Sequence, residues 1–104
     1  MKLPVPLSFE WNKGNIDKNW QKHKVHYKEA EEVFQNDQLQ IFPDLKHSEK
    51  EKRFVAFGLT NSKRKLSVFF TVRDAQIRVI SVRDQSRRER KVYEKEKQKY
   101  KPKK

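Results

Sequence analysis

Three apolar runs in the middle of the chain decide the fold: RFVAFGL (residues 53–59), KLSVFFTV (65–72) and QIRVISV (76–82). They are rich in Val, Ile and Phe, which favour strands, and short polar links separate them. Links this short suit antiparallel neighbours better than helical crossovers, so the runs predict an antiparallel meander. The pairs Phe69–Phe70 and Val79–Ile80 put apolar groups on both faces of the strands. We therefore expect helices to cover one face and another segment to cover part of the second.

The part of the chain before this meander predicts two helices between two short strands. Apolar and polar residues alternate over residues 7–11, which is the period of a half-buried strand. A helix over residues 13–23 should follow, with Asn12 as its N-cap. A second helix begins near residue 27, and residues 39–43 then predict a short strand that ends at a proline. One stripe of the second helix is apolar: Tyr27, Ala30, Val33 and Phe34.

The C-terminal segment predicts a basic helix. Ser86 and Glu89 have the spacing of a capping box, so the helix should begin there and run toward Lys99. Residues 87–104 hold 10 Lys plus Arg and 3 Glu, a local net charge of +7. The helix either contacts phosphates or an acidic partner segment, or it is a solvated helix supported by its own ion pairs. The surplus of positive charge favours a binding role.

Together these elements predict a single α+β domain over residues 1–104, because a chain of 104 residues has room for one modest core. The core should span about residues 7–95, and residues 96–104 should form a basic, frayed tail. We expect a small antiparallel sheet of about four to five strands. Two N-terminal helices should pack on it, together with the basic C-terminal helix.

The composition points to an anionic partner. The chain carries 26 Lys plus Arg against 14 Asp plus Glu, a formal net charge of +12. Such an excess attracts polyanions, although an acidic protein partner or a merely basic surface would also account for it. The chain contains no cysteine, which excludes disulfides and thiolate metal sites. No apolar run approaches the ~20 residues that span a bilayer, and the N-terminus lacks a signal-peptide core. We expect a cytoplasmic protein without membrane contact.

Arginine is the residue type best placed to carry chemistry. A serine nucleophile would lack its flanking glycines, and two glycines cannot make a phosphate loop. His23 and His26 lie among lysines that repel a cation, so we expect no metal and no cofactor. Arginines on rigid strands match phosphate oxygens. By strand alternation Arg78 should project opposite to Ser81 and Arg83, unless a bulge intervenes. The alternative is that each arginine is solvated or pairs with one carboxylate: Asp44, Glu51, Asp74 or Asp84.

His47 stands in a predicted polar turn, with Glu51 and Arg53 close behind it. RNA cleavage by internal transfer needs a base for the 2′-OH proton, cations for the phosphorane and an acid for the departing 5′-oxygen. A histidine or carboxylate among arginines could supply these groups. The plainer alternative is that His47 is simply an exposed loop residue.

Several of these residues resemble the pattern of the BrnT toxin family, in order and with its spacing, over about residues 7–95. The front half matches at Phe9-Glu10-Trp11, Lys22-His23, Val25, Glu29-Ala30 and Val33-Phe34. The match continues with Asp44, His47-Ser48, Glu51, Arg53-Phe54, Gly58, Thr71, Arg73, Ile77-Arg78-Val79-Ile80-Ser81, Arg83, Glu89-Arg90 and Tyr93-Glu94. The chain departs from the family's usual residues at Asn12, at Lys24 where glycine is common, at His26-Tyr27 and at Val82.

The resemblance implies a ribonuclease toxin of a type II toxin–antitoxin pair, with a RelE-like fold. It implies an RNA substrate and a BrnA-like antitoxin partner, and contact with promoter DNA only through the antitoxin complex. The catalytic set that it carries over is His47, Glu51, Arg53, Arg73, Arg78 and Arg83, without settling which of them transfers protons. For nucleic-acid binding outside that set we expect Arg87, Arg88, Arg90 and Lys91. The main hypothesis is thus a metal-independent endoribonuclease that cleaves mRNA and arrests growth until its antitoxin binds.

Two other hypotheses remain open at this point. One is a non-catalytic module that binds nucleic acid through the same charge and shows salt-sensitive retention without cleavage. The other is an inactive interaction protein that keeps only its antitoxin-binding face. Cleavage of labelled RNA in the presence of EDTA separates the main hypothesis from both.

Overall fold

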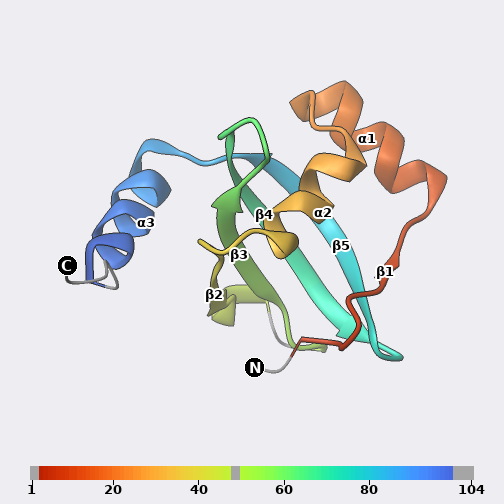
Figure 1. Cartoon of the computed structure of the whole chain (residues 1–104). Helices are drawn as coiled ribbons and strands as arrows, with labels where there is room; N and C mark the ends of the chain where they lie inside the picture. The colour runs from red at the N-terminus through yellow and green to blue at the C-terminus, as the bar shows by residue number, and fades with distance from the viewer. Residues whose placement is uncertain (1–2, 48–49, 100–104) are drawn as a thin grey trace.

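The protein is an α+β domain with a five-stranded sheet, seen in a computed structural model that describes residues 3–47 and 50–99 (Figure 1). The strand order is β1-β5-β4-β3-β2. The elements are β1 (Phe9–Glu10), α1 (Lys13–His23), α2 (Tyr27–Gln35), β2 (Gln40–Pro43), the 3₁₀ helix η1 (Leu45–His47), β3 (Phe54–Leu59), β4 (Lys65–Arg73), β5 (Gln76–Asp84) and α3 (Arg87–Lys99). The predicted fold class is confirmed, α1 has its predicted bounds, and α2 begins at the predicted residue. None of the described helices is long and apolar enough to cross a membrane.

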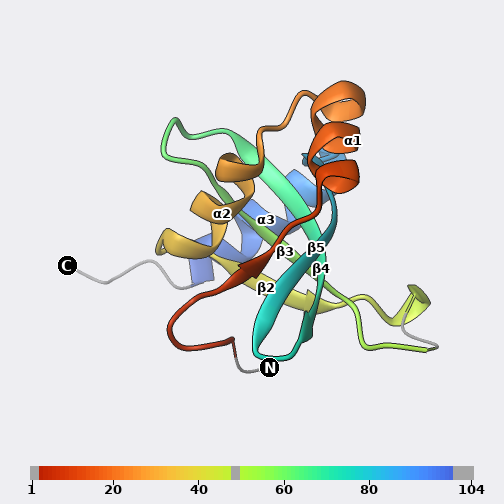
Figure 2. The same ribbon diagram turned by 90° about the vertical axis from the view of Figure 1, so that its right-hand side faces the viewer.

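Strands β2 to β5 form the predicted antiparallel series, but the sheet as a whole is mixed. β1 lies alongside β5 and is parallel to it, with Phe9 opposite Ile77 (Figure 2). The expectation of a wholly antiparallel sheet is therefore wrong at this edge. Alternation identifies a strand but carries no information about its direction, and β1 is only two residues long.

Helices α1 and α2 cover one face of the sheet. The buried side chains of α2 include Ala30 and Val33, which pack with Val68 of β4 and Val79 of β5 in the main core. α2 approaches the sheet closely at Gly58, where an added Cβ would lie 2.7 Å from Cγ1 of Val33. Glycine at this point of β3 is therefore a packing requirement of the α2 contact.

Helix α3 covers part of the opposite face, as the apolar pattern predicted. Its Tyr93 is fully buried against Phe57 and Leu59, which alternate along β3 with the residues of the main core. The Tyr93 hydroxyl donates to the backbone oxygen of Gln38 at 2.7 Å. The predicted capping box is present, because Glu89 N donates to Ser86 Oγ and Ser86 N donates to Glu89 Oε1. α3 continues through Lys99, and the rest of the predicted tail, residues 100–104, lies outside the described residues.

A β-bulge in β5 changes which side chains share a face. Phe69 of β4 pairs with Ser81, whereas Phe70 pairs with Val79, so Ile80 is an extra residue on β5. Because of this extra residue, Arg78 projects on the same side as Arg83, away from the main core. The prediction from strict alternation, that Arg78 and Arg83 project on opposite faces, is thus wrong. The bulge is the reason, and it is the exception that we allowed for in the sequence.

Candidate active site

Two adjoining cavities lie where the segment before β3 meets the ends of β4 and β5. The larger has a volume of about 630 Å³ and is lined by Lys46, His47, Lys50, Glu51, Arg53 and Arg73. The smaller, of about 350 Å³, is lined by Asn12, Asn15, Lys18, Glu51, Arg53, Thr71, Arg73, Arg78, Val79 and Ile80. Glu51, Arg53 and Arg73 line both cavities, so the two adjoin each other along these side chains.

His47 is held in the larger cavity by Asp44, the residue that precedes η1. The Asp44 carboxylate lies 3.1 Å from Nδ1 of His47, and His47 N donates to the Asp44 backbone oxygen. Asp44 N in turn donates to the backbone oxygen of Arg53 at 2.8 Å, which ties this turn to the start of β3. A carboxylate on Nδ1 keeps the proton on that nitrogen and leaves Nε2 for proton exchange with a ligand. Ser48, which the family resemblance includes, lies outside the described residues.

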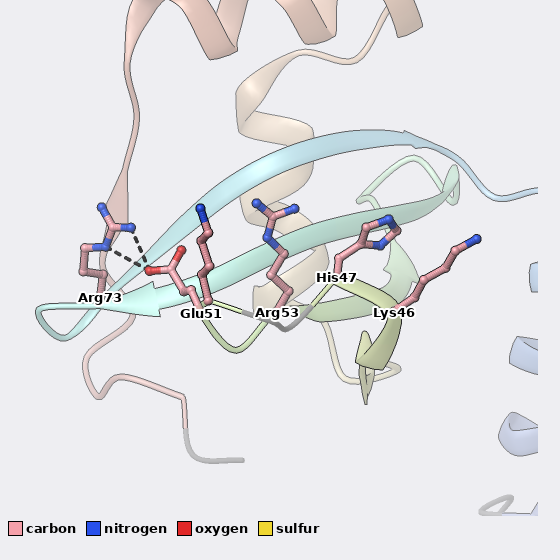
Figure 3. A pocket seen from close by; sticks show the side chains of 6 residues that line it. Lys46, His47, Glu51, Arg53 and Arg73 are labelled. Atoms are coloured by element: carbon pink, nitrogen blue, oxygen red, sulfur yellow. Dashed lines mark hydrogen bonds and ion pairs between the residues drawn. The ribbon is translucent and has the colours of Figure 1, made fainter.

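The charged side chains of the larger cavity stand in a row, shown in Figure 3. Arg73 and Glu51 occupy one end, His47 and Lys46 the other, and Arg53 lies between them (Figure 3). Glu51 is directed toward Arg73, whose Nε and Nη2 both donate to Glu51 Oε2, at 3.1 and 2.7 Å. This hydrogen bonding to Glu51 raises the pKa of Arg73.

Arg78 lies in the smaller cavity, where the bulge directs it. Its Nη1 lies 4.0 Å from Oε2 of Glu10 in β1, a long ion pair. Arg78 pairs with Thr71 across the sheet, and both residues line the cavity. The structure therefore brings five of the six predicted catalytic residues together: His47, Glu51, Arg53, Arg73 and Arg78.

Arg83 is the predicted residue that lines neither of these two cavities. Its guanidinium donates to both carboxylate oxygens of Glu89, at 2.6 and 2.9 Å, and lies over the ring of Phe69. The hydrogen bond from Arg83 to Glu89 raises the pKa of Arg83. Burial alone would raise the pKa of Glu89, but hydrogen bonds from Arg83, Ser86 and Ser67 lower it to about 2. This arginine thus anchors the start of α3 to the sheet.

The four basic residues predicted for nucleic-acid binding all lie in the first turns of α3. Another cavity, of about 530 Å³, runs between α3 and β4 and is lined by Lys65, Arg87, Arg90, Lys91, Glu94 and Lys95. Arg88 is exposed but does not line this cavity. Lys65 Nζ lies 2.6 Å from Oε1 of Glu94, the one carboxylate in this lining. The other four lining residues are Lys or Arg, so the lining has a surplus of positive charge.

The two histidines outside the cavity, His23 and His26, lie at helix ends. His26 is the N-cap of α2, and its Nδ1 accepts from Lys28 N. His23 ends α1, and burial followed by the charges of Lys22 and Arg83 lowers its pKa. Within residues 3–47 and 50–99, no three His, Asp or Glu side chains form a group that could hold a metal ion.

Several lining residues were not predicted. Lys46 and Lys50 are close to His47 in sequence, so their position in the same polar turn could have indicated that they line the site. Asn15, Lys18 and Thr71 enter the site through the packing of α1 and β4 against β5, which no local pattern reveals.

Comparison with known proteins identifies the family of the chain. Residues 11–89 match the family described as "Ribonuclease toxin, BrnT, of type II toxin-antitoxin system". The fold is similar to the crystal structure of the Brucella abortus ribonuclease toxin BrnT, with a TM-score of 0.59 and 23% sequence identity. That similarity covers 78% of this chain and 99% of the Brucella chain. No curated protein sequence matches the chain. Because the family match spans most of the chain, the protein belongs to the BrnT family of ribonuclease toxins of type II toxin–antitoxin systems.

Proposed function

We propose that the protein is a metal-independent endoribonuclease that cleaves mRNA by attack of a 2′-OH group, and that it arrests growth in the cytoplasm until an antitoxin binds. The observation that carries the proposal is the larger cavity, in which two groups able to transfer protons flank a guanidinium. A basic module that only bound RNA would not require this arrangement.

The order of side chains in Figure 3 suits in-line displacement at phosphorus. The attacking 2′-oxygen and the departing 5′-oxygen must lie on opposite sides of the phosphorus atom. His47 and Glu51 lie on opposite sides of Arg53 in this view, so a phosphate held by Arg53 would have one of them on each side once the Glu51 carboxylate turns from Arg73 toward the 2′-oxygen. Neither Arg nor Lys can fill these roles as readily, because both remain protonated near neutral pH.

In the proposed reaction Glu51 accepts the proton of the 2′-OH while the 2′-oxygen bonds to phosphorus. His47, positioned through Nδ1 by Asp44, gives a proton from Nε2 to the 5′-oxygen as the phosphorus–5′-oxygen bond breaks. The products are a 2′,3′-cyclic phosphate and a 5′-hydroxyl. Both proton transfers balance without a cofactor.

Arg53 and Arg73 neutralise the charge that develops on the phosphorane, because both line the cavity beside the proton-transferring groups. Arg78, in the adjoining cavity, binds the substrate strand. Arg83 lies on the same face of the sheet as Arg78, but Glu89 engages it. We therefore assign it to contacts with the RNA strand farther from the cleaved link and to holding α3 against the sheet.

The antitoxin of the pair is proposed to be BrnA-like and to bring the toxin to promoter DNA only as a complex. The cavity beside α3 supports a polar, acidic contact with either the antitoxin or RNA, because five of its six lining residues are Lys or Arg.

Incubation of the purified protein with labelled RNA in EDTA tests this proposal. The parent should cut, and Arg53→Ala or Arg73→Ala should each lower the rate about 10²–10³-fold. Lys28→Ala removes one exposed charge from α2, outside both cavities, and serves as the matched control. Salt-sensitive binding of RNA without any cleavage by the parent would instead support the non-catalytic module.

A further inference from the structure

The smaller cavity takes part of its lining from a segment that the proposed reaction does not use. Asn12, Asn15 and Lys18 come from the start and middle of α1, and they face the bulged part of β5. With a volume of about 350 Å³, the cavity falls within the range of sites that hold a small ligand. It borders the larger cavity along Arg53 and Arg73.

Hydrogen bonds to the backbone of β5 hold α1 in place beside this cavity. β1 pairs with β5 at Ile77 and Arg78, and farther along side chains of α1 bond to the β5 backbone. Asn15 Nδ2 donates to the backbone oxygen of Val79, and Asn19 Oδ1 accepts from Val82 N at 3.2 Å. These bonds set the position of Lys18, which lies on the same helix between the two asparagines.

The charge of the lining favours an anion. Lys18, Arg53, Arg73 and Arg78 line the cavity, against Glu51 as the one carboxylate among its lining residues. Glu51 is engaged by Arg73, and Arg78 stands 4.0 Å from Glu10. Lys18 Nζ makes a long contact of 3.4 Å with the backbone oxygen of Ile80, in an exposed position. A phosphate could therefore reach both Lys18 and Arg78 without breaking a short ion pair.

We propose that the smaller cavity is a second nucleotide subsite, in which Lys18 and Arg78 hold the phosphate next to the one that is cleaved. This inference rests on the proposed function, because it places the scissile phosphate in the larger cavity. It specifies the substrate further: a single RNA strand that extends past the cleaved link and lies across Arg53 and Arg73 toward α1. Lys18 is the residue of this subsite that the family resemblance did not supply.

Salt-dependent binding tests the subsite without relying on cleavage. The probe is a fluorescent 2′-O-methyl RNA octanucleotide, which binds but lacks the attacking hydroxyl. Loss of one phosphate contact on a single strand lowers the slope of log K against log salt concentration by about 0.7. Lys18→Ala should therefore weaken binding and reduce the slope by about that amount. Lys18→Arg should restore the parent slope, and Lys28→Ala should leave it unchanged.

Thermal unfolding of each variant separates binding from structure, since Lys18→Ala should keep the melting temperature of the parent within about 2 °C. Equal slopes for Lys18→Ala, Lys28→Ala and the parent would overturn the subsite even if the protein cleaves RNA. A reduced slope in a protein that cuts no RNA would keep the subsite as a binding site and reject the proposed reaction.

Discussion

Replacement of Glu89 by Gln should expose how strongly α3 is held to the sheet. The substitution keeps the shape of the side chain but removes the charge that faces Arg83. The pKa of Glu89 lies at about 2 in the folded protein against 4.5 ordinarily, a difference equivalent to about 3 kcal/mol at most. Glu89 and Arg83 are 18% and 33% exposed, so solvent screening reduces this figure, and we expect a loss of about 1–2 kcal/mol at pH 7.

The direction of the Glu89 pKa shift determines how the stability difference changes with pH. The folded pKa is depressed, so the stabilisation is fully present above about pH 5 and is lost as the pH falls toward 2. Urea unfolding at pH 7 and at pH 2.5, followed by the fluorescence of Trp11 and Trp20, should show a gap between parent and Glu89→Gln that narrows in acid. Glu94→Gln, in the more exposed pair with Lys65, is the control and should cost less than about 0.5 kcal/mol. A gap of the same size at both pH values would refute the electrostatic explanation.

Two further substitutions test the fold. Lys24 ends α1 in a left-handed conformation with φ of 55°, so Lys24→Gly should stabilise the protein by about 0.5–1 kcal/mol. Lys22→Gly, inside α1, should instead destabilise it by about 1 kcal/mol. Urea unfolding measures both changes, and a loss of stability in Lys24→Gly would contradict the claim that Lys24 is strained. Gly58→Ala should cost about 1–3 kcal/mol because its Cβ would lie 2.7 Å from Val33. The double variant with Val33→Ala should be destabilised by less than the two single effects combined, and full additivity would show that the close contact is not the cause.

Much of the fold was predictable because its signals are local. The meander, both N-terminal helices and the Ser86–Glu89 cap follow from periodicity and from turn and cap residues. The direction of β1 and the bulge at Ile80 were not, because both depend on how distant segments pair. A single extra residue on β5 reversed the predicted side of Arg78 relative to Arg83.

The site, like the fold, combines residues that local sequence reveals with residues that only the packing of distant segments brings in. His47, Glu51 and Arg53 are close in sequence, so their proximity could be predicted. Arg73 and Arg78 stood out as arginines on or beside predicted strands, and the family resemblance assigned them to the catalytic set. The contribution of Lys18 required the packing of α1 along β5. Arg83 was placed by its residue type, but its pairing with Glu89 depends on the path of α3 over the sheet.

The most direct test of the account uses an RNA oligonucleotide that the protein cuts at one link, compared with the same oligonucleotide carrying 2′-deoxyribose on the 5′ side of that link. We predict that the deoxy substitution abolishes cleavage there, and that the unmodified RNA yields 2′,3′-cyclic phosphate and 5′-hydroxyl ends in EDTA. Continued cutting at the deoxy position, or ends that carry a 5′-phosphate, would contradict the claim that the cavity around Arg53 breaks RNA through its own 2′-oxygen.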